Sequence, residues 1–134
     1  MFDLTGMTAL VTGASGGIGS AICHALAAQG AQLAVSGSNV EKLEAFRASL
    51  GGDHVAVPCN LGDKDSVEAL VPAALEKLGK IDILVNNAGM VQSGKSVKRA
   101  KLGGLSDADW AHHMALNIGV TFHCIRAALP AMQA

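Results

Sequence analysis

The chain has 134 residues, with 10 Lys and Arg against 11 Asp and Glu, and a formal net charge of −1 at pH 7. This length predicts a single domain over residues 1–134, and a hydrophobic content of 50% excludes general disorder. The near-neutral charge argues against nucleic-acid binding, which needs a basic surface. No apolar run approaches the roughly 20 residues that span a bilayer, and no basic segment precedes the first apolar stretch. We therefore expect a cytoplasmic protein without a membrane partner.

The cysteines and histidines do not have the spacing of a metal site. Cys23, Cys59 and Cys124 are odd in number, far apart in the chain and not arranged as C-x-x-C. His112 and His113 are adjacent, so they would point about 100° apart on a helix. The sequence therefore predicts buried free thiols and no metal.

Short apolar runs alternate with segments of helical spacing. Four runs rich in Val, Ile and Leu are predicted strands, at residues 8–12, 32–36, 54–58 and 81–86. Three predicted helices lie between them and end at glycines, at Gly30, Gly51 and Gly79. Pro72 falls inside the third helix and should bend or interrupt it. Repeated strand–helix–strand units of this length predict a parallel sheet in a doubly wound α/β fold.

The pattern changes after the fourth predicted strand. Residues 90–105 form a polar stretch that carries four of the ten basic residues, at Lys95, Lys98, Arg99 and Lys101. We interpret this stretch as a solvated loop, with contact to an anionic substrate as the alternative. Ser106 then resembles a helix N-cap with Asp109 three residues later, and a long helical pattern follows over residues 110–129.

The strongest motif is Thr-Gly-Ala-Ser-Gly-Gly-Ile-Gly at residues 12–19. It follows the first predicted strand and begins the first predicted helix, where backbone N–H groups can hold a diphosphate. Gly13 permits the turn, Gly17 allows close approach of a ligand, and Gly19 allows the helix to pack on the strand, while Ser15 adds a hydroxyl. The motif predicts dinucleotide binding, and a purely structural turn is the alternative.

Two further features extend this motif into a family resemblance. Residues 86–89 read Asn-Asn-Ala-Gly at the end of the fourth predicted strand, and Asn117 lies in the following helix. With the spacing at residues 12–19, these features resemble the short-chain dehydrogenase/reductases. Residues 1–89 look most similar to the bacterial 3-oxoacyl-[acyl-carrier-protein] reductases. The resemblance implies a Rossmann-type sheet of order 3-2-1-4, and it covers the N-terminal half of a typical member.

The resemblance assigns cofactor positions along the chain. The implied cofactor-binding residues are Gly13, Ser15, Gly17, Ile18, Gly19, Ser38, Asn60, Leu61, Asn86, Ala88 and Gly89. The alternatives are that Asn60 caps a turn and that Asn86 and Asn87 tie strands together. Residues 36–39, at the end of the second predicted strand, contain neither an acidic residue for a ribose hydroxyl nor an Arg for a 2′-phosphate. Their small hydroxyl side chains leave room for a phosphate, so the sequence favours NADP(H) over NAD(H).

A second nucleotide motif overlaps the first. Residues 89–96 satisfy G-x-x-x-x-G-K-[ST], the phosphate loop of nucleoside-triphosphate-binding proteins. However, Gly89 already belongs to Asn-Asn-Ala-Gly, and no long helical pattern follows directly. We therefore rank this hypothesis below the dinucleotide site.

The resemblance implies hydride transfer between a nicotinamide and a carbonyl carbon, with a 3-oxoacyl thioester as one candidate substrate. The family uses a Ser, a Tyr, a Lys and a helix Asn, and only Asn117 matches this catalytic set. The sequence contains no Tyr. We therefore expect a fold truncated after the fourth strand and its helix, inactive alone and prone to self-association. The alternatives are a non-catalytic nucleotide-binding or self-association module and an inactive truncated product.

Overall fold

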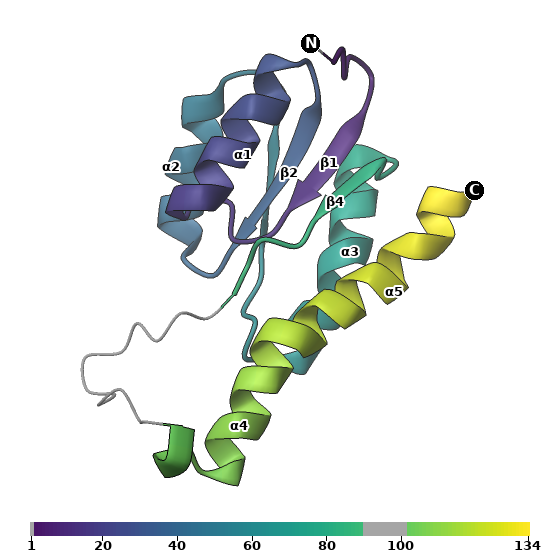
Figure 1. Ribbon diagram of the computed structural model, residues 1–134. Coiled ribbons are helices and arrows are strands. Elements are labelled where there is room, and N and C mark those ends of the chain that lie inside the picture. Colours follow the sequence, from purple (N-terminus) through teal and green to yellow (C-terminus); the bar gives the residue numbers. More distant parts are fainter. Residues whose placement is uncertain (1, 90–101) are drawn as a thin grey trace.

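The computed structural model describes residues 2–89 and 102–134, and its centre is a four-stranded parallel sheet (Figure 1). The strands are β1 (Thr8–Val11), β2 (Gln32–Gly37), β3 (Val55–Pro58) and β4 (Ile83–Val85). They are ordered β3-β2-β1-β4, and Val11 lies beside Val35 on one side and Val85 on the other. The predicted doubly wound fold and strand order are confirmed.

Helices cover both faces of this sheet. They are α1 (Gly17–Ala28), α2 (Val40–Leu50), α3 (Lys64–Leu78), α4 (Asp107–Met114) and α5 (Val120–Gln133). Successive strand residues point to opposite faces, so Val11 packs in one core with α1 and α2, and Leu10 in another with α3 and α5. Figure 1 shows the two pairs of helices on either side of the sheet. The strands are apolar on both faces because both faces are covered.

Helix α3 continues past Pro72, so the predicted interruption is wrong. Proline removes one backbone hydrogen bond from the ladder, to the carbonyl of Glu68. The neighbours of Pro72 compensate, since Leu70, Val71 and Ala74 are almost fully buried against the sheet. The helix then ends as predicted at Gly79, whose φ of 80° lies in the left-handed region that glycine adopts without strain.

The C-terminal helical segment begins as predicted but is less regular than its pattern suggests. Ser106 and Asp109 form a reciprocal capping box, in which the Asp109 N–H donates to the Ser106 hydroxyl at 3.1 Å. Between α4 and α5 the backbone widens into one π-helical turn, η2 (Ala115–Gly119). There the N–H of Val120 donates to the carbonyl of Ala115, five residues back. A short 3-10 turn, η1 (Leu102–Gly104), precedes α4.

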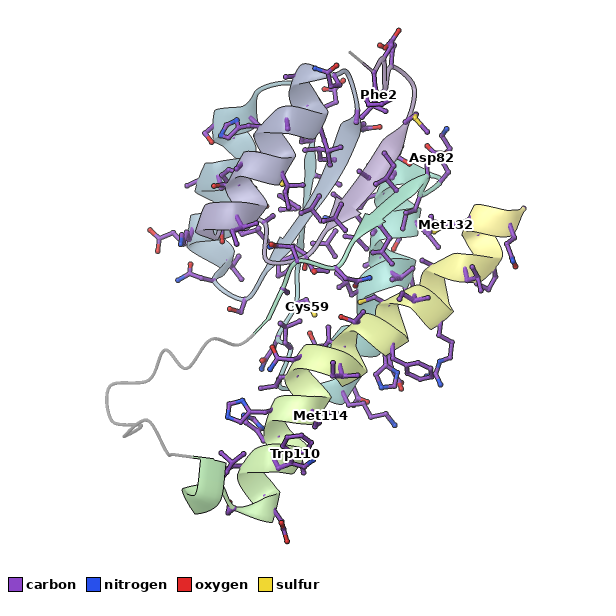
Figure 2. All side chains as sticks on the ribbon, viewed as in Figure 1. Phe2, Cys59, Asp82, Trp110, Met114 and Met132 are labelled. Atoms are coloured by element: carbon purple, nitrogen blue, oxygen red, sulfur yellow. The ribbon has the colours of Figure 1, made fainter. Side chains whose placement is uncertain are left out.

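The three cysteines are buried free thiols, as predicted. Burial raises the pKa of Cys23 and of Cys124 to about 11. Figure 2 shows Cys59 at the carboxyl end of the sheet and Asp82 at the opposite, amino end. Within residues 2–89 and 102–134, no helix is both long and apolar enough to cross a membrane.

The imidazole of His54 accepts a backbone hydrogen bond near the amino end of β2. The Nδ1 atom of His54 accepts a hydrogen bond of 3.1 Å from the backbone N–H of Leu33. Burial lowers the pKa of His54, and the positive charge of Arg47 lowers it further against the opposing effect of Asp53. The neutral imidazole is therefore the form that the folded state favours.

This contact predicts a pH-dependent stability. The pKa of His54 in the folded state lies below its usual value of about 6.5. The contribution of His54 to the free energy of unfolding is therefore fully present above about pH 6.5 and is lost as the pH falls through the pKa of the folded state. The side-chain carbonyl of asparagine can accept the same N–H hydrogen bond and does not titrate. We therefore expect His54→Asn to reduce the pH dependence of the melting temperature between about pH 7 and 5. His54→Ala should melt lower than the wild type at pH 8. Parallel pH profiles for the wild type and His54→Asn would contradict the assignment.

Candidate functional site

Hydrogen bonds join the carboxyl ends of β1 and β4. Thr12 is only 2% exposed, and its hydroxyl accepts from the backbone N–H of Asn87 at 3.1 Å and of Ala88 at 3.0 Å. In return, the Asn87 side-chain amide donates to the carbonyls of Thr12 at 3.0 Å and Gly13 at 3.1 Å. The interpretation that the asparagine pair ties strands together therefore holds for Asn87.

Two glycines are required by the packing of α1 on this junction. Gly13 has a φ of +64°, and a Cβ there would lie 3.0 Å from the Cα of Ala88. A Cβ on Gly19 would overlap the carbonyl oxygen of Gly13 and lie 2.7 Å from the Asn87 amide nitrogen. By contrast, a Cβ on Gly17 would meet nothing within 4 Å. The motif thus packs tightly at two glycines and leaves open space at the third.

The beginning of α1 differs electrostatically from those of the neighbouring helices. Helices α2, α3 and α4 begin at Asn39, Asp63 and Ser106, whose side chains accept backbone N–H bonds, and each carries an acidic residue in its first turn. Helix α1 begins at Gly16 with no side-chain cap and no acidic residue in its first turn. The N–H groups of the first turn of a helix have no partner inside the helix, and the helix dipole makes this end positive. This end of α1 is therefore suited to an anionic ligand.

A cleft of about 520 Å³ opens at this end of α1, over the carboxyl ends of the strands. Its lining is Thr12, Gly13, Ser15, Gly16, Gly17, Ile18, Gly19, Ser36, Gly37, Ser38, Lys42, Cys59, Leu61, Asn87, Ala88 and Gly89. Among the residues that the structure describes, this lining contains no carboxylate and one cation, Lys42. A larger hollow of about 700 Å³ lies at the amino ends of the strands beside Met7 and His54. Ligands of open α/β sheets bind at the carboxyl ends, so the smaller cleft is the candidate site.

Most of the predicted cofactor residues meet at this cleft. Those that line it are Gly13, Ser15, Gly17, Ile18, Gly19, Ser38, Leu61, Ala88 and Gly89. Their roles toward a ligand remain predictions.

Asn60 and Asn86 are not part of the cleft lining. The side-chain oxygen of Asn60 accepts from the N–H of Gly62 at 3.1 Å, which is the turn cap considered as the alternative. The side-chain oxygen of Asn86 is buried and accepts no hydrogen bond from the residues that the structure describes. The structure therefore places Asn87 in the cleft wall instead of its neighbour.

Asn117 lies in the π turn, beside the end of β4. Its side-chain amide donates to the carbonyl of His113 at 3.0 Å. A Cβ on Gly89 would lie 3.1 Å from the Asn117 side-chain oxygen, so this asparagine borders one wall of the cleft. Single π turns are frequent at functional sites. The catalytic role of Asn117 remains a prediction.

Sequence reasoning missed Lys42 and Cys59 as cleft residues. Lys42 lies in the first turn of α2, beyond residues 36–39, where a phosphate ligand was sought. The sequence feature that could have indicated Lys42 is its position three residues after Asn39, the N-cap residue with which the first turn of α2 begins. The phosphate-loop match at residues 89–96 and the basic stretch from Lys95 to Lys101 lie, apart from Gly89, outside the described residues.

Comparison with known proteins assigns the chain to a family. A family model described as short chain dehydrogenase matches residues 7–134. The chain belongs to the short-chain dehydrogenase family. Nodulation protein G of Rhizobium sp. (strain N33) is 47% identical over 126 residues, which are 94% of this chain and 49% of that protein. The 3-oxoacyl-[acyl-carrier-protein] reductase FabG of Rickettsia conorii is 36% identical over 132 residues, or 98% of this chain and 51% of that protein. The chain thus spans about half the length of these short-chain dehydrogenase relatives.

Solved structures of the family superimpose on the chain over a similar share. A blue fluorescent protein from a metagenomic library, in complex with NADPH, has 34% identity and a TM-score of 0.84, covering 97% of this chain and 53% of that chain. A 3-ketoacyl-(acyl-carrier-protein) reductase from Brucella melitensis, complexed with NADH, has 29% identity and a TM-score of 0.83, covering 96% and 50%. The resemblance inferred from residues 12–19 and 86–89 is confirmed.

The two glycines Gly17 and Gly19 are expected to respond differently to substitution. Gly19→Ala would force its Cβ against the Gly13 carbonyl, and we expect a loss of about 1–3 kcal/mol in the free energy of unfolding. Gly17→Ala should leave stability unchanged or raised, because its Cβ meets open space and alanine favours helices. Urea denaturation of both variants measures the difference, and equal losses would refute the packing argument.

Proposed function

We propose that the chain binds a nicotinamide dinucleotide in the cleft and forms the cofactor-binding half of an NAD(P)-dependent oxidoreductase. The observation that carries this proposal is the start of α1, which has neither a side-chain cap nor an acidic residue and opens into the cleft. A diphosphate fits there because it can accept hydrogen bonds from the first-turn N–H groups and carries the charge that the helix dipole favours. Family membership and the NADPH and NADH complexes of relatives support the same ligand class.

The residues of the cleft fit such a cofactor. Gly17 leaves room where the diphosphate would approach the backbone, and no carboxylate among the described lining residues opposes its charge. Leu61 offers an apolar surface where an adenine would lie, and Ala88 and Gly89 border the opposite end. The bound nicotinamide would supply the chemistry of hydride transfer.

The proposed nicotinamide end of the cleft would face the substrate. Asn117 lies against Gly89 there, on a helix that begins outside the sheet. We propose a carbonyl substrate of the 3-oxoacyl thioester type, supported by the similarity to the Rickettsia conorii reductase. The family's proton donor is a Tyr, and the sequence has none. We therefore propose that a polypeptide of these 134 residues binds the cofactor without turnover of such a substrate.

Cofactor binding can be tested independently of catalysis. We expect calorimetric titration with NADP⁺ or NAD⁺ to detect one site per chain. Gly17→Asp should abolish binding while preserving the fold, because its carboxylate would enter the anion site and no neighbour obstructs its Cβ.

Gly104→Asp is the matched control, since Gly104 is exposed in η1, has equally open surroundings and lies outside the cleft. It should bind as the wild type does. A folded wild type that binds neither dinucleotide would overturn the proposed function, and so would unchanged binding by Gly17→Asp.

Self-association is a second candidate function, favoured by an apolar stripe along α4, η2 and α5. The stripe is Trp110, Met114, Ile118, Phe122, Ile125, Leu129 and Met132, which are 39–58% exposed. The opposite side of the same segment is buried, at Leu116, Val120, Cys124 and Ala128. Figure 2 shows Trp110 and Met114 on α4, at the end that extends beyond the sheet. A contiguous exposed apolar surface of this kind marks an interaction site, and we propose a second copy of the chain as its partner.

We expect size-exclusion chromatography with light scattering to show a dimer or larger species. The double change Phe122→Glu and Ile125→Glu should shift it toward the monomer, because two charges would have to be buried in the interface. Phe2→Glu alters a side chain that is 86% exposed, away from the stripe, and should leave the mass unchanged. A wild type that is monomeric at all concentrations tested would exclude this function.

A further inference from the structure

A second hollow, separate from the cofactor cleft, lies between residues 61–67 and residues 112–123, and we call it the π-turn pocket. Its volume is about 260 Å³. One wall is the start of α3 with the turn before it, and the other is formed by α4, η2 and α5. Helices α3 and α5 pack against each other along this side of the sheet (Figure 1). Among the described residues, the pocket shares only Leu61 with the cleft.

The floor of the π-turn pocket is apolar and its size suits a small molecule. Val67, Leu116 and Val120 line it, and each is 4% exposed. Ala115 and Gly119, at the two ends of the π turn, contribute no more than a methyl group to the wall, so the space between the helices stays unfilled. A volume of about 260 Å³ equals that of about nine waters at roughly 30 Å³ each. The pocket therefore has room for a body of fewer than about ten heavy atoms.

One hydrogen-bond donor of this pocket is fixed by a neighbouring cation. His123 lines the pocket, and its Nδ1 atom lies 3.0 Å from a terminal guanidinium nitrogen of Arg126. A guanidinium can only donate, so Nδ1 is the acceptor of this bond and the proton of the neutral ring is on Nε2. Arg126 is itself held over the ring of Phe122, 5.0 Å from its centroid. The Nε2–H group of His123 is therefore the donor that remains for a ligand.

The charges around the pocket favour an anion. Lys64 and His112 also line it, and the described lining residues include no carboxylate. The Lys64 ammonium pairs with Glu68 at 3.6 Å, which engages one of its three donors, and the Asp63 carboxylate is occupied as the cap of α3. A carboxylate can accept from such donors while an attached hydrocarbon covers the apolar floor. We infer that the π-turn pocket binds a small carboxylate with a short apolar body, held by Lys64 and His123.

The test titrates the whole chain with hexanoate and follows the backbone N–H signals by two-dimensional NMR. Gly62 and Gly119, which line the pocket and not the cleft, should shift with a Kd of about 1 mM. Gly13 and Gly17 line the cleft and report binding of the carboxylate at the start of α1 instead. Hexanamide has no charge and should bind about five- to tenfold more weakly. Acetate lacks the apolar chain and should bind more weakly by about tenfold or more.

Substitutions separate the two parts of the pocket. Ala115→Phe should abolish the shifts, because Ala115 is exposed and a ring there would fill the pocket. Ala111→Phe is the matched control, since it makes the same change at an exposed position of α4 outside the lining. Lys64→Gln and His123→Phe should each weaken hexanoate binding by about two- to fivefold. Lys80→Gln removes another exposed, ion-paired lysine, outside the pocket, and should leave the Kd unchanged.

Several results would overturn the inference. Shifts confined to Gly13 and Gly17 would assign the carboxylate to the start of α1. Equal Kd values for hexanoate and hexanamide would refute recognition of the charge. No shift at about ten times the expected Kd, unchanged binding by Ala115→Phe, or equal loss in Ala111→Phe would refute the pocket itself. Each of these results would leave the proposed function standing, because nicotinamide binding is measured separately and in the cleft.

Discussion

The hydrogen-bonded junction between Thr12 and Asn87 is the constraint on which the rest of the molecule depends. It fixes the ends of two neighbouring strands against each other through a buried hydroxyl and a side-chain amide that donates twice. The carbonyl of Gly13, held by this amide, is also the atom on which Gly19 packs. The position and direction of α1 therefore follow from a side chain more than seventy residues away in sequence.

The electrostatic character of the cleft depends on which helix lacks a cap as well as on which residues line the cleft. Three other helices neutralise their positive ends with side-chain oxygens and nearby carboxylates, whereas α1 leaves its end to a ligand. Within residues 2–89 and 102–134, the cleft wall likewise contains Lys42 and no acid. In the free protein, water must satisfy the first-turn N–H groups that no side chain caps. This helix end is consistent with recognition of an anionic ligand.

Much of the fold could be predicted because its signals are local. Strands buried on both faces produce unbroken runs of Val, Ile and Leu, and the helices between them end at glycines such as Gly79, with its positive φ. The motif at residues 12–19 could be interpreted for the same reason, since its glycines act within one turn of the chain. The capping box of Ser106 and Asp109 is equally local and was also predicted.

The features that could not be predicted depend on contacts distant in sequence or on small geometric changes. Nothing near residue 87 indicates that Asn87, and not Asn86, reaches Gly13. The position of Lys42 depends on how α2 is oriented by its buried Leu43, which is a property of tertiary packing. Pro72 was overestimated as a helix breaker because the burial of its neighbours outweighs one lost hydrogen bond.

The π turn also has a consequence for comparing chains of different length. A π turn holds one residue more than an α-helical turn. The helical segments on either side of it therefore keep the rotation about the helix axis that they would have in a regular α-helix one residue shorter. A homologous chain lacking that residue would present the same outer stripe and the same inner row. A one-residue gap opposite positions 115–119 in an alignment would therefore indicate a regular α-helical turn in place of the widened one beside Gly89, even where every neighbouring position matched.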